Sequence, residues 1–251
     1  MKNPHFYAVI IGSEILNGRR EDKHFLYLRD ALLRRGFTLF SSSIIKDDPV
    51  LIHNTFSMIK NDPDAVMFSF GGIGSTPDDL TRQIASNVFS DGELIPHEQF
   101  TQDIIERFAE AAYPHRVHMA ELPKKSELLH NTINNMSGFY LEDRFFFMPG
   151  FPEMSHPMVE EALEYFYPNA PLHYRHTLIA QTSENTLIDV MNRMDKSVDF
   201  SSLPMMNGGN PIVEISVASL NYELGIQNFQ LFIDALEEKL IPFEIILNNK
   251  K

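Results

Sequence analysis

The stretch that decides the fold is Asp64–Thr81, which reads Asp-Ala-Val-Met-Phe-Ser-Phe-Gly-Gly-Ile-Gly-Ser-Thr-Pro-Asp-Asp-Leu-Thr. The apolar run Ala65–Phe70 predicts a strand that is buried on both faces. Three glycines, Gly71, Gly72 and Gly74, follow the run directly. Because glycine permits positive φ and carries no Cβ, these residues let a ligand approach the backbone closely.

The residues after the glycines have the pattern of a helix N-terminus. We predict Thr76 as the N-cap, Pro77 as the first helical residue and Asp79 as the third, near the positive end of the helix dipole. A strand, a glycine turn and a helix start together predict an anion site made of backbone N–H groups. The spacing matches neither the Rossmann nor the P-loop pattern, so a plain tight turn is the alternative.

The segments upstream of this stretch alternate between strand and helix. The predicted order is strand Phe6–Gly12, helix Asp22–Arg35, strand Thr38–Ile45 and a helix that starts at Asp47-Asp48-Pro49. Short connections between such segments favour a parallel sheet with right-handed crossovers. Ligands of open α/β sheets bind at the carboxyl ends of the strands, where Glu14 follows the first strand.

Downstream, the pattern predicts a helix, an irregular or briefly helical stretch, a hairpin and a rigid turn into a further helix. These segments are Glu98–Ala112, Tyr113–Lys125, the strand pair Gly138–Leu141 and Arg144–Phe147, and the turn Met148–Met154 with a helix that ends near Tyr167. Pro168–Pro171 has the composition of a linker. We therefore predict two domains, residues 1–168 and 171–251.

The second domain has the order of a split βαβ fold. Its predicted elements are strand Tyr174–Ala180, helix Asn185–Met194, strands Asp199–Leu203 and Ile212–Leu220, helix Asn228–Leu240 and strand Phe243–Leu247. The segment Asn207–Asn210 is predicted to be a hairpin loop between the middle strands.

Composition limits the classes of partner. The net charge of −13 argues against a general nucleic-acid binder, which needs a basic surface. There is no cysteine, which excludes disulfides and thiolate chemistry. No apolar run approaches the ~18 residues of a membrane helix, and the start lacks a signal-peptide pattern. We expect a cytoplasmic protein with no membrane or nucleic-acid partner.

Three motifs resemble the N-terminal part of the competence/damage-inducible CinA-type family. Ile11–Arg19 is similar to that family's Gly-Asp-Glu-Leu-Leu-x-Gly segment. Gly71–Thr81 is similar to its Gly-Gly-x-Gly-Pro-Thr-x-Asp-Asp-x-Thr signature, and Met148–Met154 to its Leu-Pro-Gly-Val-Pro-x-Glu-Met turn. The residues after Pro171 resemble the small domain that follows in the family. No counterpart of the family's C-terminal amidohydrolase domain is evident, so deamidation is not implied.

The resemblance implies a three-layer α/β fold with a parallel or mixed sheet, of the molybdopterin-binding (MoaB/MogA-like) type. It implies a small-molecule ligand: a nucleoside diphosphate compound such as ADP-ribose or FAD, or a molybdopterin-type compound. It also implies a homo-oligomer. Several positions depart from the family pattern, among them Ser13, His24, Ser75 and the stretch Val117–Met119, where the family has Arg-Lys-Gln.

Two functions stay open on the sequence. The first is a metal-dependent pyrophosphatase, in which a divalent cation, Mg²⁺ or Co²⁺, bridges diphosphate oxygens. The second is a degenerate family member that binds a nucleotide or pterin, or only assembles, without turnover.

The candidate residues cluster on the three motifs. Asp79 and Asp78 are the catalytic candidates, and Asp79 and Asp22 are the metal candidates, although each also suits a helix start. The ligand-binding candidates are Gly12, Glu14, Gly71, Gly72, Gly74, Ser75, Thr76, Pro149 and Gly150. His24 is a further candidate. The pairs His115–His118 and His173–His176 have metal-ligand spacing but no evident third ligand.

Overall fold

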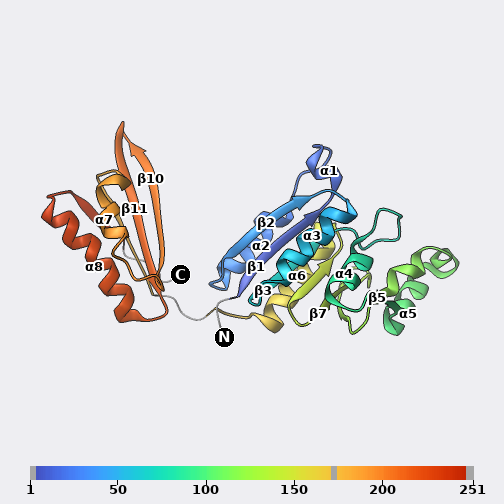
Figure 1. The fold of residues 1–251 in the computed structure, drawn as a ribbon. Helices are drawn as coiled ribbons and strands as arrows, with labels where there is room; N and C mark the ends of the chain where they lie inside the picture. Colours follow the sequence, from blue (N-terminus) through green and yellow to red (C-terminus); the bar gives the residue numbers. More distant parts are fainter. Residues whose placement is uncertain (1–3, 171–173, 247–251) are drawn as a thin grey trace. The chain divides into compact units, whose positions relative to one another are not determined.

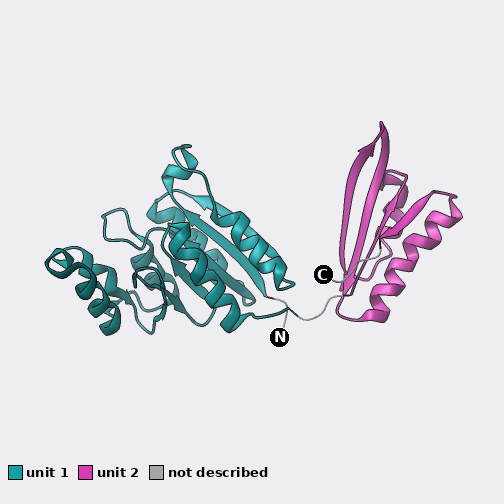
Figure 2. Cartoon of the chain, turned by 180° about the vertical axis from the view of Figure 1, so that it is seen from behind, with its two compact units in different colours: residues 1–170 teal, residues 171–251 magenta. Residues whose placement is uncertain are grey.

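The computed structural model describes residues 4–170 and 174–246. The chain divides into two compact units, residues 1–170 and 171–251, which Figure 2 colours separately. Each unit has its own sheet and its own hydrophobic core. Among the described residues, no helix is both long and apolar enough to cross a membrane.

The first unit is built on a six-stranded sheet. In sheet order its strands are β2 (Leu39–Ile45), β1 (His5–Ile11), β3 (Ala65–Phe70), β8 (Phe145–Met148), β7 (Gly138–Leu141) and β6 (Glu127–Leu129). The first four strands are parallel, and β7 and β6 are antiparallel to their neighbours. The predicted α/β class with a mixed sheet is confirmed. The short strand β6 has no predicted counterpart.

Helices cover both faces of this sheet and make the three layers (Figure 1). On one face lie α3 (Pro49–Lys60) and α4 (Thr81–Phe89), which share an apolar cluster with the odd-numbered side chains of β1 and β3, and α5 (Glu98–Phe108) extends that cluster beyond the sheet (Figure 1). On the other face lie α2 (His24–Arg34) and α6 (Pro152–Phe166), which pack on the even-numbered ones. Both sets of side chains on β3 are buried, which explains its continuous apolar run.

Local sequence signals produce the predicted start of α3 and the predicted end of α2. The Asp48 side chain accepts a hydrogen bond from the N–H of Leu51 at 2.8 Å, and Pro49 takes the first helical position of α3. At the end of α2, Gly36 has a φ of +81°, as a glycine after a helix C-terminus requires.

The predicted start of α4 is wrong. The helix begins at Thr81, so Thr76 is not its N-cap and Asp79 is not its third residue. Instead, Asp79 Oδ2 accepts hydrogen bonds from the Thr76 N–H at 2.8 Å and the Thr76 hydroxyl at 2.6 Å. The Asp79 side chain, predicted to lie in the first turn of the helix, therefore closes a turn that precedes the helix.

The segment between α5 and β6 also differs from the prediction. The predicted helix Glu98–Ala112 stops at Phe108, because Ala109 has a φ of +48°, and continues as the 3₁₀ helix η1 (Ala109–Ala112). A second 3₁₀ helix, η2 (Arg116–Ala120), leads into β5 (Glu121–Pro123), which pairs with β4 (Leu94–Pro96). The sequence analysis missed this small ribbon.

The second unit has the predicted split βαβ topology. Its antiparallel sheet has the order β10 (Asp199–Asn207), β11 (Asn210–Ser219), β9 (Tyr174–Ala180) and β12 (Phe243–Ile246). The helix α8 (Tyr222–Glu238) packs on the buried face through Phe229, Phe232 and Leu236.

Two helices of the second unit differ from the prediction. The helix α8 starts at Tyr222 rather than Asn228, because Asn221 accepts a hydrogen bond from the N–H of Leu224 and caps it. The predicted helix Asn185–Met194 is a 3₁₀ helix, η3 (Glu184–Leu187), followed by the short α7 (Ile188–Met191). The last predicted strand residue, Leu247, lies outside the described residues.

Candidate functional site

The site is organised by the turn that leaves β3. Gly71 and Gly72 have φ values of +101° and +70°. A Cβ on Gly71 would lie 2.3 Å from the carbonyl oxygen of Ile11, and one on Gly72 would lie 2.3 Å from Thr81 Oγ1. Both positions therefore require glycine for conformation and for space.

Thr81 holds this turn closed. Its N–H donates to the carbonyl of Gly72 at 2.9 Å, and its hydroxyl donates to the carbonyl of Gly71 at 3.0 Å. The Thr81 side chain is fully buried, so these bonds are shielded from water. In contrast, within the described residues the N–H groups of Gly72, Ile73, Gly74 and Ser75 donate no hydrogen bond. The loop thus presents a run of unused donors.

The first βα turn lies beside the glycine turn. The short helix α1 (Ser13–Leu16) is tied to the end of β2, because the Ser13 N–H donates to Asp47 Oδ2 at 2.8 Å. The Glu14 carboxylate lies against Gly12, with Oε1 3.1 Å from where a Cβ on Gly12 would be. The carboxylates of Glu14 and Asp47, which follow β1 and β2 in the chain, therefore reach the same edge of the sheet.

The Pro149-Gly150 turn forms the third wall. Gly71 donates its N–H to the carbonyl of Met148 at 2.9 Å, which brings the ends of β3 and β8 together. A Cβ on Gly150 would lie 3.4 Å from the Cα of Gly71. Phe151, 57% exposed, follows this turn, and the Arg20 guanidinium lies 5.2 Å from its ring centre.

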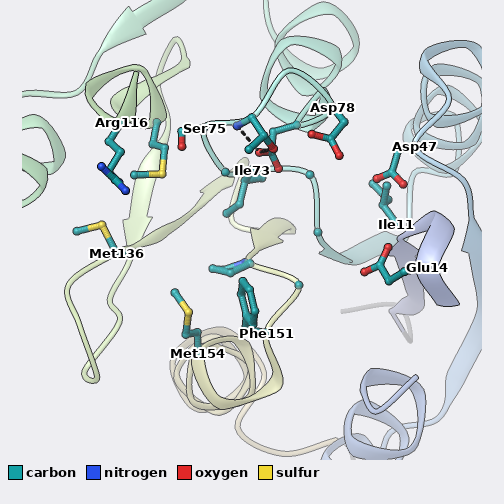
Figure 3. A pocket seen from close by; sticks show the side chains of 18 of the residues that line it. Ile11, Glu14, Asp47, Ile73, Ser75, Asp78, Arg116, Met136, Phe151 and Met154 are labelled. Atoms are coloured by element: carbon teal, nitrogen blue, oxygen red, sulfur yellow. Dashed lines mark hydrogen bonds between the residues drawn. The ribbon is translucent and has the colours of Figure 1, made fainter. Parts of the chain in front are cut away.

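These three turns surround a cavity of about 890 Å³ at the carboxyl ends of β1, β3 and β8. Figure 3 shows Glu14, Asp47 and Asp78 on one side of it and Arg116, Met136 and Met154 on the other. Its polar and charged lining side chains are Glu14, Arg19, Arg20, Asp47, Ser75, Thr76, Asp78, Asp79, Arg116 and Ser137. Its apolar lining side chains are Ile11, Ile73, Phe100, Phe108, Met119, Met136, Pro149, Phe151 and Met154.

Most of the predicted ligand residues line this cavity. They are Glu14, Gly71, Gly72, Gly74, Ser75, Thr76, Pro149 and Gly150, together with both acidic candidates, Asp78 and Asp79. Gly12 is not in the lining, although the Glu14 side chain beside it is. Asp22 is also outside the lining; it accepts hydrogen bonds from the N–H groups of His24 at 2.8 Å and Phe25 at 3.2 Å.

The two acidic candidates have different surroundings. Asp79 is half-buried and its Oδ2 is occupied by the two Thr76 donors. Asp78 is exposed at the cavity, where hydrogen bonds from the Thr76 hydroxyl and from its own N–H lower the pKa of its carboxyl group. Asp78 is therefore the more exposed carboxylate of the pair, and it is ionised at neutral pH.

His24 is a packing residue behind the cavity. Its ring stacks on Phe70 with 4.4 Å between ring centres and lies edge-on to His156. Burial lowers the pKa of His24 to about 4, so it is neutral at pH 7. Burial also lowers the pKa of His156. Neither imidazole lines the cavity.

Of the two histidine pairs, only His115–His118 lies wholly within the described residues, and it forms no metal cluster there. His118 pairs with Glu121, with 2.9 Å between Nδ1 and Oε1, and His173 lies outside the described residues. Across residues 4–170 and 174–246, no group of three or more His, Asp or Glu side chains is placed to hold a metal ion.

Several lining residues were missed by the sequence analysis. Asp47 follows the second strand, which pairs in parallel with the first. Because the carboxyl ends of parallel neighbours lie at the same edge of a sheet, the strand order alone would place Asp47 beside Glu14. The Phe and Met side chains of the apolar wall carry no sequence signal that distinguishes them from core residues. Arg116 belongs to none of the sequence motifs. In the structure its guanidinium lies over the ring of Phe108, 4.7 Å from the ring centre.

Comparisons with known proteins agree on the first unit. The family model described as "Probable molybdopterin binding domain" matches residues 7–169. A CinA-like protein of Acaryochloris marina is 26% identical over 232 residues, which cover 88% of this chain and 55% of that protein. A CinA-like protein of Citrifermentans bemidjiense is 31% identical over 160 residues, which cover 61% of this chain and 38% of that protein.

A solved structure shows the same fold. The crystal structure of the protein CinA from Thermoplasma acidophilum aligns with a TM-score of 0.56 and 24% identity, and the alignment covers 65% of this chain and 98% of that one. The resemblance that the motifs indicated is thereby confirmed. The chain spans about half the length, or less, of the two curated relatives, 55% and 38%.

Proposed function

The chain belongs to the molybdopterin-binding domain family, and on that premise we propose that it binds a phosphorylated nucleotide or pterin in the cavity at the carboxyl ends of β1, β3 and β8. The observation that supports this proposal best is the run of unused N–H donors from Gly72 to Ser75 at the cavity edge. Backbone N–H groups in a glycine turn bind phosphate oxygens without a lysine.

The cavity suits a ligand with a charged end and an apolar end. Its volume of about 890 Å³ lies within the ~300–1,000 Å³ of small-molecule pockets. The glycine turn would hold the phosphate, and the wall made by Phe100, Met119 and Met136 would take a planar ring. Phenylalanine faces and methionine sulfur contact aromatic rings favourably.

Resident divalent-metal binding has limited support from this donor set. Asp79 Oδ2 is already used within its turn, and no cluster of three acidic or histidine ligands occurs among the described residues. Mg²⁺ can be held by one or two carboxylates together with substrate phosphates, and it would neutralise phosphate charge there. Asp78, with Asp47 or Glu14, is the set that such an ion would use.

A second candidate function is hydrolysis of the diphosphate bond of an ADP-ribose- or FAD-like compound. The three carboxylates Glu14, Asp47 and Asp78 on one side of the cavity favour it, since a carboxylate beside a bound phosphate can orient an attacking water. In this proposal the Asp78 carboxylate acts as the general base that orients the water, and Asp79 shapes the loop.

Binding is tested by calorimetric titration and thermal shift with ADP-ribose, FAD, AMP and molybdate, each with and without Mg²⁺ or Co²⁺. A ligand at ~100 times its Kd should stabilise the fold by about 2.7 kcal/mol. Ser75→Glu places a negative charge at the loop and should remove the shift. The control is Ser42→Glu on the exposed face of β2. Binding that survives Ser75→Glu would place the ligand elsewhere.

Turnover is tested by phosphorus NMR of ADP-ribose and FAD with the purified protein. Hydrolysis should be slowed at least ~100-fold by Asp78→Asn. It should be unchanged by Asp91→Asn, an exposed acid paired with Lys124 and outside the cavity lining. Binding without any product would identify a non-catalytic family member.

We infer a cytoplasmic homo-oligomer with no nucleic-acid partner. The homo-oligomer is inferred from the family, whereas the other two expectations rest on the composition and the net charge of −13. Light scattering after size exclusion measures the subunit number, and a monomer would contradict the inference.

A further inference from the structure

Arg82 lies directly behind the glycine loop, in the first turn of α4. Its Nη1 donates to the carbonyl oxygens of Ile73 and Gly74, the latter at 2.6 Å. Arg82 is half-buried and is not among the residues that line the cavity. Among the described side chains, no other donates to either carbonyl.

These two bonds fix the direction of two peptide units. The carbonyl of Ile73 shares its peptide unit with the N–H of Gly74, and the carbonyl of Gly74 shares its unit with the N–H of Ser75. Both units are trans, and a trans peptide directs its N–H opposite to its C=O. Because both carbonyls point to Arg82, the N–H groups of Gly74 and Ser75 point away from it.

Two nearby carboxylates favour the charged form of the Arg82 guanidinium. Burial lowers the pKa of the guanidinium, while the carboxylates of Asp79 and Glu121 oppose that shift. Asp79 also accepts the Thr76 N–H, so one acid fixes the next part of the loop and faces the same arginine. A cation bonded to a carbonyl polarises the peptide and makes its N–H a stronger donor.

We propose that Arg82 is a positioning residue of the anion site: from behind the loop it turns the Gly74 and Ser75 N–H groups toward the ligand's phosphate. This inference rests on the proposed function. Arg82 itself does not touch the ligand. Its effect is to keep two donors aligned before binding, so that the ligand does not have to reorient the loop.

The test compares Arg82→Gln with Arg82→Lys and a matched control, Arg144→Gln. Arg144 is also half-buried and also donates to a backbone carbonyl, that of Pro63, which precedes β3 at the opposite end of the strand. With ADP-ribose as the probe, Arg82→Gln should weaken binding at least about tenfold. Arg82→Lys should fall between it and wild type, and Arg144→Gln should stay within about twofold. A folded Arg82→Gln variant that binds within twofold of wild type would overturn the proposal.

A ligand-free measurement separates this inference from the proposed function. In ¹H–¹⁵N spectra of the protein without ligand, Arg82→Gln should shift or broaden the amide signals of Gly74 and Ser75, whereas Arg144→Gln should not. Unchanged Gly74 and Ser75 signals would overturn the role of Arg82, whether or not ADP-ribose binds. If wild type fails to bind ADP-ribose while the two amides still respond, only the proposed ligand is wrong. Arg82→Lys replaces Arg82→Gln in both measurements if the glutamine variant does not fold.

Discussion

Two glycine pairs in this chain use the same residue for different reasons. At Gly71 and Gly72, φ is positive and an added Cβ would lie 2.3 Å from a neighbouring oxygen in each case. At Gly208 and Gly209, in the hairpin between β10 and β11, φ is +57° and +87° but nothing lies within 4 Å of an added Cβ. The first pair is required by conformation and by close packing, the second by conformation alone.

The difference separates a ligand-site turn from a connecting turn. The hairpin pair is a two-residue loop of the kind that positive φ at both positions demands. The pair after β3 lets the ends of β1, β3 and β8 approach closely, so that backbone forms the part of the cavity wall at Gly71, Gly72 and Gly150. Glycine spacing alone does not distinguish the two cases, whereas the space around each Cα does.

The largest expected effect is that of Gly71→Ala. The new Cβ would clash with the carbonyl of Ile11, which is backbone of β1, a strand with a neighbour on each side, and has little freedom to move. We expect a loss of roughly 3–5 kcal/mol in the free energy of unfolding of the first unit. Urea denaturation followed by hydrogen exchange of β3 peptides measures it. A loss under 1 kcal/mol would mean that the two turns do not differ in packing.

Lowering the pH should reduce the free energy of unfolding of the first unit, by a smaller amount than Gly71→Ala does. His24 stacks on Phe70, and its pKa is about 4 in the fold against 6.5 for the free side chain. Between these values the unfolded chain binds more protons, so stability is full above pH 6.5 and falls as the pH is lowered toward 4. From pH 7 to pH 5 the loss should be about 2 kcal/mol.

Hydrogen exchange of β3 peptides at the two pH values, corrected for intrinsic rates, measures this loss. His24→Asn, which keeps a polar side chain that does not titrate, should reduce the pH dependence. Equal pH dependence in the variant and in wild type would contradict the assignment to His24.

Gly208→Ala should have a moderate effect on the second unit. The Cβ meets no neighbour, so the cost is that of alanine at a positive φ, about 1 kcal/mol. Urea denaturation followed by hydrogen exchange of β11 peptides measures it, and ligand titration of the first unit should not change. A cost as large as that of Gly71→Ala would remove the distinction between the two turns.

The smallest effect is expected at Leu240, where the backbone has a positive φ but the residue is not glycine. Leu240 follows α8 with a φ of +52° and is 91% exposed, and the N–H of Ile241 donates to the carbonyl of Leu236 as in a Schellman motif. Leu240→Gly should stabilise the second unit by about 0.5 kcal/mol. The thermal midpoint of the variant measures the gain, and a lower midpoint would show that the Leu240 side chain contributes packing.

The fold was largely predictable because its signals are local. The buried run of β3, the Asp48 cap, the Gly36 helix end and the strand-helix alternation each depend on neighbours in the sequence. The antiparallel strands β5 and β6 were missed, since three residues carry too little periodicity to be recognised.

The order of the elements and the place of the glycine turn at the carboxyl edge of the sheet follow from the amino-acid sequence alone. Which side chains and hydrogen bonds meet at that edge depends on the packed fold. Asp79 bonds to Thr76, Asp47 crosses to Ser13, and Arg82 lies behind the loop carbonyls. The physical reason is that local patterns record burial and turn conformation, whereas these bonds depend on which remote or sterically constrained groups the packed sheet brings within about 3 Å of each other.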